Sequence, residues 1–415
     1  MKGKEAIIDN YRRPFSLILL YLLFEFGRPQ GIIPALDVLH LPGVVTIFLI
    51  FYLIRYGKFS FSDPQTKLYL LLIFFMVFHI PFALNNYWAF NIWRTMVLLF
   101  FIYLCIISFV NTSEKYYKLI YAWIYIHIFL AIFGIFHRGR GVGGFLGDEN
   151  DFCMTINMAI PFAYFMAMGE KASSKKLFYI AVTCLFVLAN IASFSRGGFV
   201  GLIGVGSYIW IKSSKKVMTA LVIAMMTLFI VLVAPEKYWD RIRSITQEGS
   251  QSGTGGERVY TWGVAWDMFK GNPLFGVGQG NAPWEFREYE IAAGFEEGLL
   301  GRSRAGRVMH SVYFTLLPEL GILGAFLFGS MIYYSYKDTK RIRDKLRKKA
   351  KMLKENTTIK DLNLGFSLEA SLIGYLVSSI FISTLYYPNF WILMGFTVCF
   401  RRMVCEENEK YPSSH

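Results

Sequence analysis

Long apolar runs recur along nearly the whole chain of 415 residues, and they limit the possible folds more than any other feature. The hydrocarbon core of a bilayer is about 30 Å thick and takes roughly 20 residues of helix. Charged residues make up only 17% of the chain, whereas a soluble domain carries about a quarter. We therefore expect an all-α integral membrane protein with about 12 transmembrane helices. The runs cover residues 14–27, 41–55, 68–85, 92–110, 117–137, 152–169, 176–194, 197–212, 217–234, 309–334, 365–386 and 388–402.

One long polar segment divides these runs into two groups. Transmembrane helices 1–9 are expected over residues 1–234, a large periplasmic loop over 235–308, and transmembrane helices 10–12 over 309–402. A charged cytoplasmic hairpin at 335–364 and a cytoplasmic tail at 403–415 complete the chain.

No small-residue cleavage site follows the first run, so the first helix is expected to be retained. The five cysteines show no CxxC spacing, which argues against a disulfide framework or a thiolate metal site.

The distribution of lysine predicts which connections face the cytoplasm, because lysine and arginine resist translocation. One alternating set of connections, which includes both ends of the chain, holds 29 of the 43 basic residues and nearly all of the lysines. We expect this set, and with it both termini, to be cytoplasmic. The net charge of +14 is then mostly a topology signal, so a nucleic-acid partner is not expected.

The opposite set of connections strongly prefers arginine over lysine. It contains 12 arginines but only two lysines, Lys237 and Lys270. The planar guanidinium binds phosphate with two parallel hydrogen bonds and stays charged. This bias predicts an anionic, phosphate-bearing ligand on the outer face, although anchoring of single arginines at the membrane surface is the simpler alternative. Membrane lipids are expected partners in either case.

The large loop contains a sequence typical of an amphipathic helix. Val259, Trp262, Trp266 and Phe269 fall at helical spacing, which predicts a helix lying on the membrane. Arg258 would stand at the N-terminal end of this helix, where backbone N–H groups favour an anion. The following stretch "GVGQGN" has no preceding strand, so a dinucleotide site is not expected.

Candidate chemical groups gather near the outer ends of the predicted helices. His310, followed by Ser311, opens the helix after the loop and can act as a proton acceptor, and Glu319 lies farther along that helix. His137 is the second candidate for a base, whereas His79 and His127 are interpreted as packing residues. The turn "SFSRGG" at 193–198 supplies Ser195 and Arg196, its glycines are expected to allow the tight turn, and the segment 138–152 supplies Arg138, Arg140 and Asn150.

Three stretches carry a resemblance to a known family. They are "SFSRGG", "ERVYTW" followed by "NPLFGVGQGN", and "HSVYFTLLPELGILG". Together with the helix layout, they resemble the O-antigen ligase and polymerase family of bacterial membrane glycosyltransferases, most specifically over 193–325. The segment "GDEN" departs from the usual pattern of that family and keeps only Asn150.

The resemblance implies an inverting glycosyltransferase of the bacterial inner membrane, without a metal or other cofactor. The donor would be an undecaprenyl-diphosphate-linked glycan, and the acceptor a lipid A core, another glycan or a protein. His310 would be the base, and Arg196 and Arg258 would hold the diphosphate. From their place on the outer face, Arg138 and Arg140 are also expected to bind the donor diphosphate. Asn150, Ser195, Ser311 and Glu319 are expected to support these groups.

Two other classes of protein remain open at this point. A transporter or flippase would need substrate groups near the bilayer midplane on discontinuous helices, whereas the polar residues here crowd the outer face. A metal-dependent transferase could use the carboxylates of "DEND" at 148–151. A purely structural scaffold would not account for the preference for arginine outside.

Overall fold

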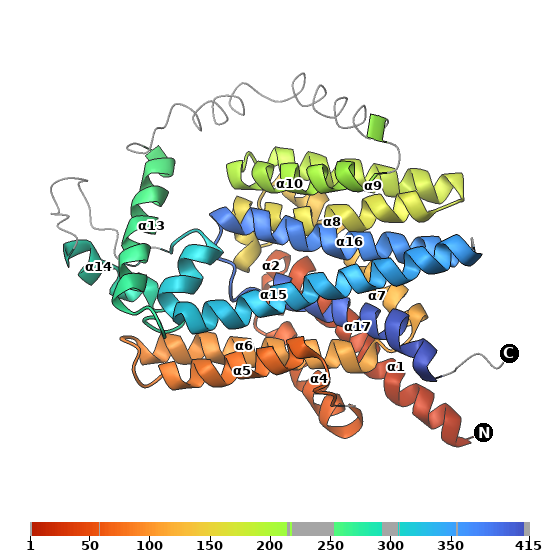
Figure 1. The fold of residues 1–415 in the computed structure, drawn as a ribbon, viewed down its shortest axis with the longest axis horizontal. Coiled ribbons are helices and arrows are strands. Elements are labelled where there is room, and N and C mark those ends of the chain that lie inside the picture. The colour runs from red at the N-terminus through yellow and green to blue at the C-terminus, as the bar shows by residue number, and fades with distance from the viewer. Residues whose placement is uncertain are drawn as a thin grey trace.

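The computed structural model describes residues 2–57, 59–213, 216–217, 253–292, 306, 308–353 and 356–410. Every regular element in these ranges is a helix, which confirms the all-helical class (Figure 1). The predicted span 217–234 lies almost wholly outside the described residues. The other predicted spans each contain a helix.

Seven of the helices in the described ranges are long and apolar enough to cross a membrane. The expected number of about 12 is therefore reached only in part. These seven spans are Pro34–Tyr56, Asn86–Phe109, Ser113–Phe136, Glu149–Gly169, Ser173–Ala192, Val312–Met352 and Thr357–Phe381. In chain order the elements are α1 (Lys2–Leu22), the π-helical turn η1 (Leu23–Gly27), α2 (Pro29–Ile32), α3 (Pro34–Asp37), α4 (Leu41–Tyr56), α5 (Pro64–His79), α6 (Asn86–Phe109), α7 (Ser113–Phe136), η2 (Gly144–Gly147), α8 (Glu149–Gly169), α9 (Ser173–Ala192), α10 (Arg196–Lys212), α13 (Gly253–Gly271), α14 (Ala282–Ala292), α15 (Val312–Leu353), α16 (Asn356–Ser378), η3 (Ser379–Phe381) and α17 (Pro388–Lys410).

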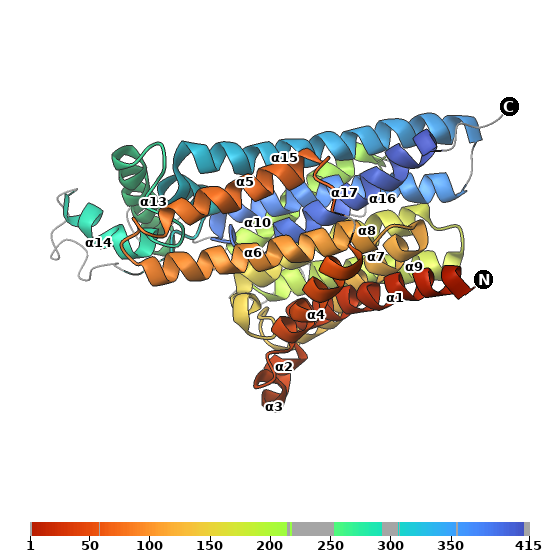
Figure 2. The same cartoon turned by 90° about the horizontal axis from the view of Figure 1, so that it is seen from below.

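The long helices run side by side along one axis and form a bundle with two distinct ends (Figures 1 and 2). The start of α1 and the end of α17 lie together at one end, which we call the terminal end (Figures 1 and 2). Helices α13 and α14 lie at the opposite end, which we call the α13 end, and α13 runs crosswise to the bundle (Figure 1).

Helix α8 forms the centre of one half of the bundle and is almost completely buried between α9, α10 and α16. Asn157 on α8 donates to the carbonyl oxygen of Gly198 at 3.0 Å and accepts from Asn190 at 2.8 Å. Gly201 allows the close approach, because a side chain there would collide with Ser378 of α16. Small residues and interhelical amide hydrogen bonds are the usual means of packing helices in a membrane.

Helix α15 is interrupted at Gly321, whose φ of 61° and ψ of −165° are not helical. The stretch after α13 binds the groups that this break frees. Backbone N–H groups of Val277 and Gly278 donate to the carbonyl oxygens of Pro318 and Glu319, at 2.8 and 2.9 Å. Polar backbone groups in a membrane protein must find partners inside the protein. The stretch "GVGQGN" is therefore a structural clasp on the broken helix.

Replacing Gly321 by alanine is expected to destabilise the protein. A Cβ atom there would lie 2.7 Å from the backbone nitrogen of Phe275 and closer still to the carbonyl group of Leu274, at a positive φ that costs about 1–3 kcal/mol in strain. The matched control is Gly329→Ala on the same helix, where a Cβ would meet nothing within 4 Å. Thermal unfolding in detergent should show a lower midpoint for Gly321→Ala than for the control. Equal midpoints would contradict this account of the break.

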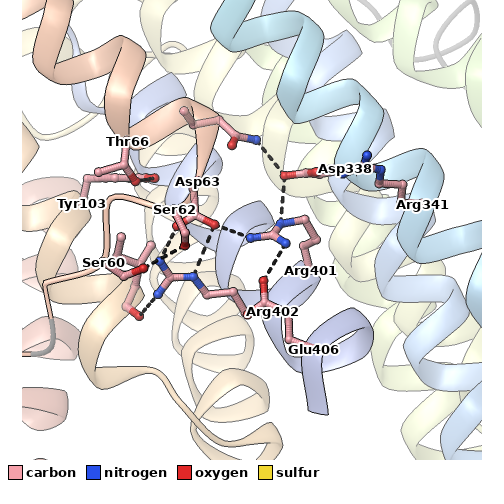
Figure 3. A network of polar contacts seen from close by, with 12 residues as sticks. Ser60, Ser62, Asp63, Thr66, Tyr103, Asp338, Arg341, Arg401, Arg402 and Glu406 are labelled. Atoms are coloured by element: carbon pink, nitrogen blue, oxygen red, sulfur yellow. Dashed lines mark hydrogen bonds and ion pairs between the residues drawn. The ribbon is translucent and has the colours of Figure 1, made fainter. Parts of the chain in front are cut away.

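An ionic network fastens three helices at the terminal end (Figure 3). Asp63, directly before α5, is buried and forms ion pairs with both Arg401 and Arg402 of α17. Arg401 also pairs with Asp338 of α15 at 3.2 Å. Asp338 accepts a hydrogen bond from Gln65 at 2.7 Å. Part of the charged stretch 335–364 is thus buried and paired, which the sequence did not predict.

Candidate active site

The turn 193–198 joins α9 to α10 at the α13 end. Its change of direction occurs at Phe194, which has a φ of 54°. Ser195 caps α10 by accepting a hydrogen bond from the N–H of Gly198 at 2.9 Å. The role expected for the glycines was wrong: both are helical, and a side chain at Gly198 would lie 2.5 Å from Cys153. They serve close packing rather than the turn itself.

Arg196 is the first residue of α10 and therefore stands where free N–H groups favour an anion. Asn150 in the first turn of α8 accepts a hydrogen bond from the Ser195 hydroxyl at 2.7 Å. Asn150 is itself held by Asp148, the N-cap of α8, which accepts from both its side-chain and its backbone nitrogen. Two helix N-termini thus meet beside Arg196, which places Asn150 and Ser195 together as the sequence led us to expect.

Arg258 reaches the same region from α13. Burial and the nearby charge of Arg196 lower the pKa of its guanidinium, while Asp148 opposes this shift. Arg258, Arg196 and Asp148 therefore lie close enough for their charges to act on one another. The expected position on the helix was wrong, because α13 begins at Gly253, so Arg258 is already in its second turn. The free N–H groups of this site therefore belong to α10.

Phe381, at the end of the short helix η3, connects these elements and was not predicted from the sequence. The Arg258 guanidinium lies over its ring at 5.7 Å. A side chain at Gly197 would lie 3.1 Å from its Cβ, so the ring also borders the start of α10. Trp262 of α13 faces it with ring centroids 6.2 Å apart. No sequence motif marks this residue, because the contacts come from segments far apart in the chain.

His310 precedes α15 and is exposed at the same end of the bundle. Its neighbours fix it on both sides: the Met309 carbonyl accepts from the Trp262 indole at 2.9 Å, and the Ser311 N–H donates to Ser383 at 3.3 Å. Its φ of 48° is unusual for a residue other than glycine or asparagine. Trp262 lies one turn after Arg258, so α13 links the histidine to the arginines.

The face of α13 that was predicted to lie on the membrane differs in part from the exposed face in the structure. Val259 and Trp266 are exposed, as expected for a helix on a membrane surface, but Trp262 turns inward and stacks on Phe314 at 4.9 Å. The buried face consists instead of Val264, Ala265 and Met268, which pack against α14. The helical spacing of the apolar residues predicted the helix itself, whereas its contacts with α14 and Phe314 determine which side chains are buried.

Arg138 and Arg140 lie on the loop that follows α7. They line a separate hollow together with His137, and Arg140 pairs with Glu149 at 3.1 Å. The ring of His137 is stacked on Phe133 at 3.8 Å, and its Nδ1 lies 2.8 Å from the Phe133 carbonyl oxygen. The ring of His137, the second candidate for the base, is therefore already in contact with Phe133 on its face and at Nδ1.

Glu319 has a structural position inside the clasp. Its carboxylate accepts hydrogen bonds from the Tyr386 hydroxyl at 2.6 Å and from the Gly280 N–H at 2.7 Å. His79 and His127 are buried, as packing residues are. Nowhere in the described ranges do three or more histidine, cysteine, aspartate or glutamate side chains gather as metal ligands. In "DEND", Asp148 caps α8 and Glu149 pairs with Arg140.

The arrangement combines two guanidiniums, a helix N-terminus and an exposed imidazole at one end of a membrane protein. Such a set can stabilise charge on a phosphate and accept a proton. Residues 180–329, just over a third of the chain, match the model of a family described as O-antigen ligase. The matched part contains Arg196, Arg258 and His310 but neither Asn150 nor Phe381. No curated protein matches the chain.

Proposed function

Because residues 180–329 carry an O-antigen ligase domain, we propose that this membrane protein transfers a glycan from an undecaprenyl-diphosphate carrier to an acceptor hydroxyl. The single observation that carries the proposal is that Arg258 and the start of α10, which carries Arg196, both lie against Phe381. Guanidiniums from two separate elements thus come to one place beside the N-terminus of a helix, where an anion is favoured.

The proposed chemistry uses these two guanidiniums. The bond between the anomeric carbon and the diphosphate breaks, and negative charge develops on the leaving phosphate, which Arg196 and Arg258 stabilise. Fixed donors act more strongly on this developing charge than on the ground state. His310 takes the proton of the acceptor hydroxyl as its oxygen attacks the anomeric carbon from the opposite face. The reaction inverts the configuration of that carbon.

We further propose that Asn150, Ser195 and Ser311 position these groups. Asn150 links the capping Ser195 to α8 at 2.7 Å, and Ser311 fixes the backbone beside His310. Acceptors compatible with the site are a lipid A core, a growing glycan and a protein hydroxyl, and they correspond to a ligase, a polymerase and a protein glycosylating enzyme. The chemistry at the anomeric carbon is the same in all three.

The proposed topology has about 12 transmembrane helices in the bacterial inner membrane, both termini in the cytoplasm and the α13 end in the periplasm. A cysteine placed at Gly263 on α13, where a side chain has open space, should react with an impermeant thiol reagent added to intact spheroplasts. A cysteine at the exposed Lys349, near the terminal end of α15, should react only after permeabilisation. The parent protein corrects for its own five cysteines. The reverse pattern would put the site in the cytoplasm and remove the proposed function.

A transporter is the rival class, and the break in α15 is the feature that would favour it. The freed carbonyl groups of Pro318 and Glu319 already accept hydrogen bonds from the clasp. The carboxylate of Glu319 is likewise engaged by Tyr386 and Gly280. The break therefore presents no unsatisfied group of these residues to a cargo, and we do not favour transport.

The function is tested with purified protein, an undecaprenyl-diphosphate-linked glycan and a lipid A core acceptor. Transfer should occur and should survive a strong chelator. Arg196→Lys should lower the rate by about 100-fold, since lysine keeps the charge but loses the two-pronged geometry. Arg94→Lys, at an exposed arginine on α6, is the control and should be neutral. Full activity of Arg196→Lys would reduce the role of Arg196 to general attraction, and loss of transfer with the chelator would favour a metal-dependent enzyme.

A further inference from the structure

A hollow of about 420 Å³ opens at the α13 end, next to the candidate active site but separate from it. The end of α7 supplies Phe133, Phe136 and His137 to its lining, and the following loop supplies Arg138 and Arg140. Gly31 of α2 closes the other side. We call this feature the loop hollow.

The loop that forms one wall of the loop hollow is held by its own hydrogen bonds. The N–H of Gly139 donates to the carbonyl oxygen of Gly134, and the Val142 carbonyl accepts from the Arg28 side chain at 3.0 Å. Gly31 lies so close that a Cβ on it would be 2.8 Å from the Val142 oxygen. The wall is therefore formed by the protein itself and does not depend on a ligand for its shape.

Two guanidiniums face this opening with little compensation from the protein. Arg138 is exposed and makes no hydrogen bond or ion pair with the residues that the structure describes. Arg140 pairs with Glu149 through Nε, yet its side chain remains 63% exposed. The positive charge of the loop hollow thus exceeds the single carboxylate beside it. A guanidinium in such a setting favours a phosphate or carboxylate ligand.

Exposed apolar side chains lie in this lining and directly after Gly31 in the chain. Phe136 is 80% exposed, and Ile32 and Ile33 are about half exposed on the segment of α2 and α3. This segment projects from the side of the bundle (Figure 2). A soluble anion would gain nothing from these surfaces. An amphiphile gains from both, because its charged group meets the arginines while its chains cover the phenylalanine and the isoleucines.

We propose that the loop hollow binds the phosphodiester headgroup of an anionic membrane phospholipid. Arg138 and Arg140 hold the phosphate, and the acyl chains lie along Phe136 and the α2–α3 segment. Gly139, which does not line the hollow, packs against Ser193 of the turn 193–198. The bound lipid therefore lies beside a loop that contacts that turn. Arg138 and Arg140 serve this lipid instead of the donor diphosphate expected from the sequence.

The test measures lipid binding by the full-length protein, independently of glycan transfer. Purified protein in detergent is titrated with phosphatidylglycerol and observed by native mass spectrometry. The double variant Arg138→Ala/Arg140→Ala should bind roughly 10- to 30-fold more weakly, since each arginine near a lipid surface contributes about 1 kcal/mol. The control Arg55→Ala/Arg94→Ala removes two exposed arginines that do not line the loop hollow, and it should bind normally.

A single variant keeps the test decisive if the double variant fails to fold. Arg138→Ala leaves the pair between Arg140 and Glu149 intact and should weaken lipid binding about fivefold. Equal binding by these variants and the control would overturn the proposal. Displacement of the lipid by millimolar glycerol phosphate would assign the site to a free phosphate, and preferential displacement by undecaprenyl diphosphate would return the arginines to the donor. Either result would also overturn it.

Discussion

Replacing His310 by alanine is expected to lower the turnover of glycan transfer by about two to four powers of ten, the usual contribution of a general base. Binding of the lipid-linked donor should remain nearly unchanged, because the guanidiniums that would hold the diphosphate belong to other elements. The measurement is the rate of transfer at saturating donor, together with equilibrium binding of the donor to the same variant.

The backbone at His310 requires a second variant, because its φ of 48° is unfavourable for alanine. Asparagine tolerates this conformation but cannot act as a base at neutral pH. His310→Asn should therefore be as inactive as His310→Ala. Recovery of activity in the asparagine variant would show that the residue serves the backbone. In that case His137 is the next base to test, although its ring is already stacked on Phe133.

Replacing Asp63 by asparagine is expected to have the largest effect on stability. The change keeps the size of the side chain but leaves Arg401 and Arg402 without their shared buried partner. Removing one member of a buried ion pair typically costs about 3–5 kcal/mol, because the remaining charge stays desolvated. Unfolding by a denaturing detergent should show the loss directly.

Glu406 provides the matched control for this prediction. It pairs with the same Arg401 at 2.7 Å, but its side chain is 47% exposed. An exposed pair contributes at most about 1 kcal/mol, so Glu406→Gln should change stability little. If Asp63→Asn and Glu406→Gln lowered the free energy of unfolding equally, the buried network of Figure 3 would contribute no more than exposed surface ion pairs do.

The helical class and the placement of most helices could be predicted from the sequence, because the length of an apolar run directly reflects bilayer thickness. The grouping of Ser195, Arg196 and Asn150 could also be predicted, since each lies next to the end of an apolar run. His310 and Arg258 were also singled out from the sequence, the resemblance supplied the roles expected for them, and the family match covers both. All of these signals are local in the chain.

The features that were missed depend on contacts between distant segments. Phe381 lies 123 positions after Arg258, whose guanidinium lies over its ring. The sequence around either residue does not indicate this contact. Asp63 meets its arginines across more than 330 positions. The period that located α13 could not fix its buried face, because α14 and Met309 determine it. The hydrophobic pattern predicts where a helix lies in the sequence, whereas the packing of neighbouring segments determines which of its faces is buried.

The clasp on α15 also has a consequence for the order in which the protein assembles during synthesis. Gln279 of the clasp donates to the Met76 and Ala89 carbonyl oxygens, which the ribosome has produced long before. The break in α15 emerges after both of these segments. The carbonyl groups that the break frees therefore find their partners at Val277 and Gly278 already synthesised, whereas the Glu319 carboxylate gains its bond from Tyr386 only later.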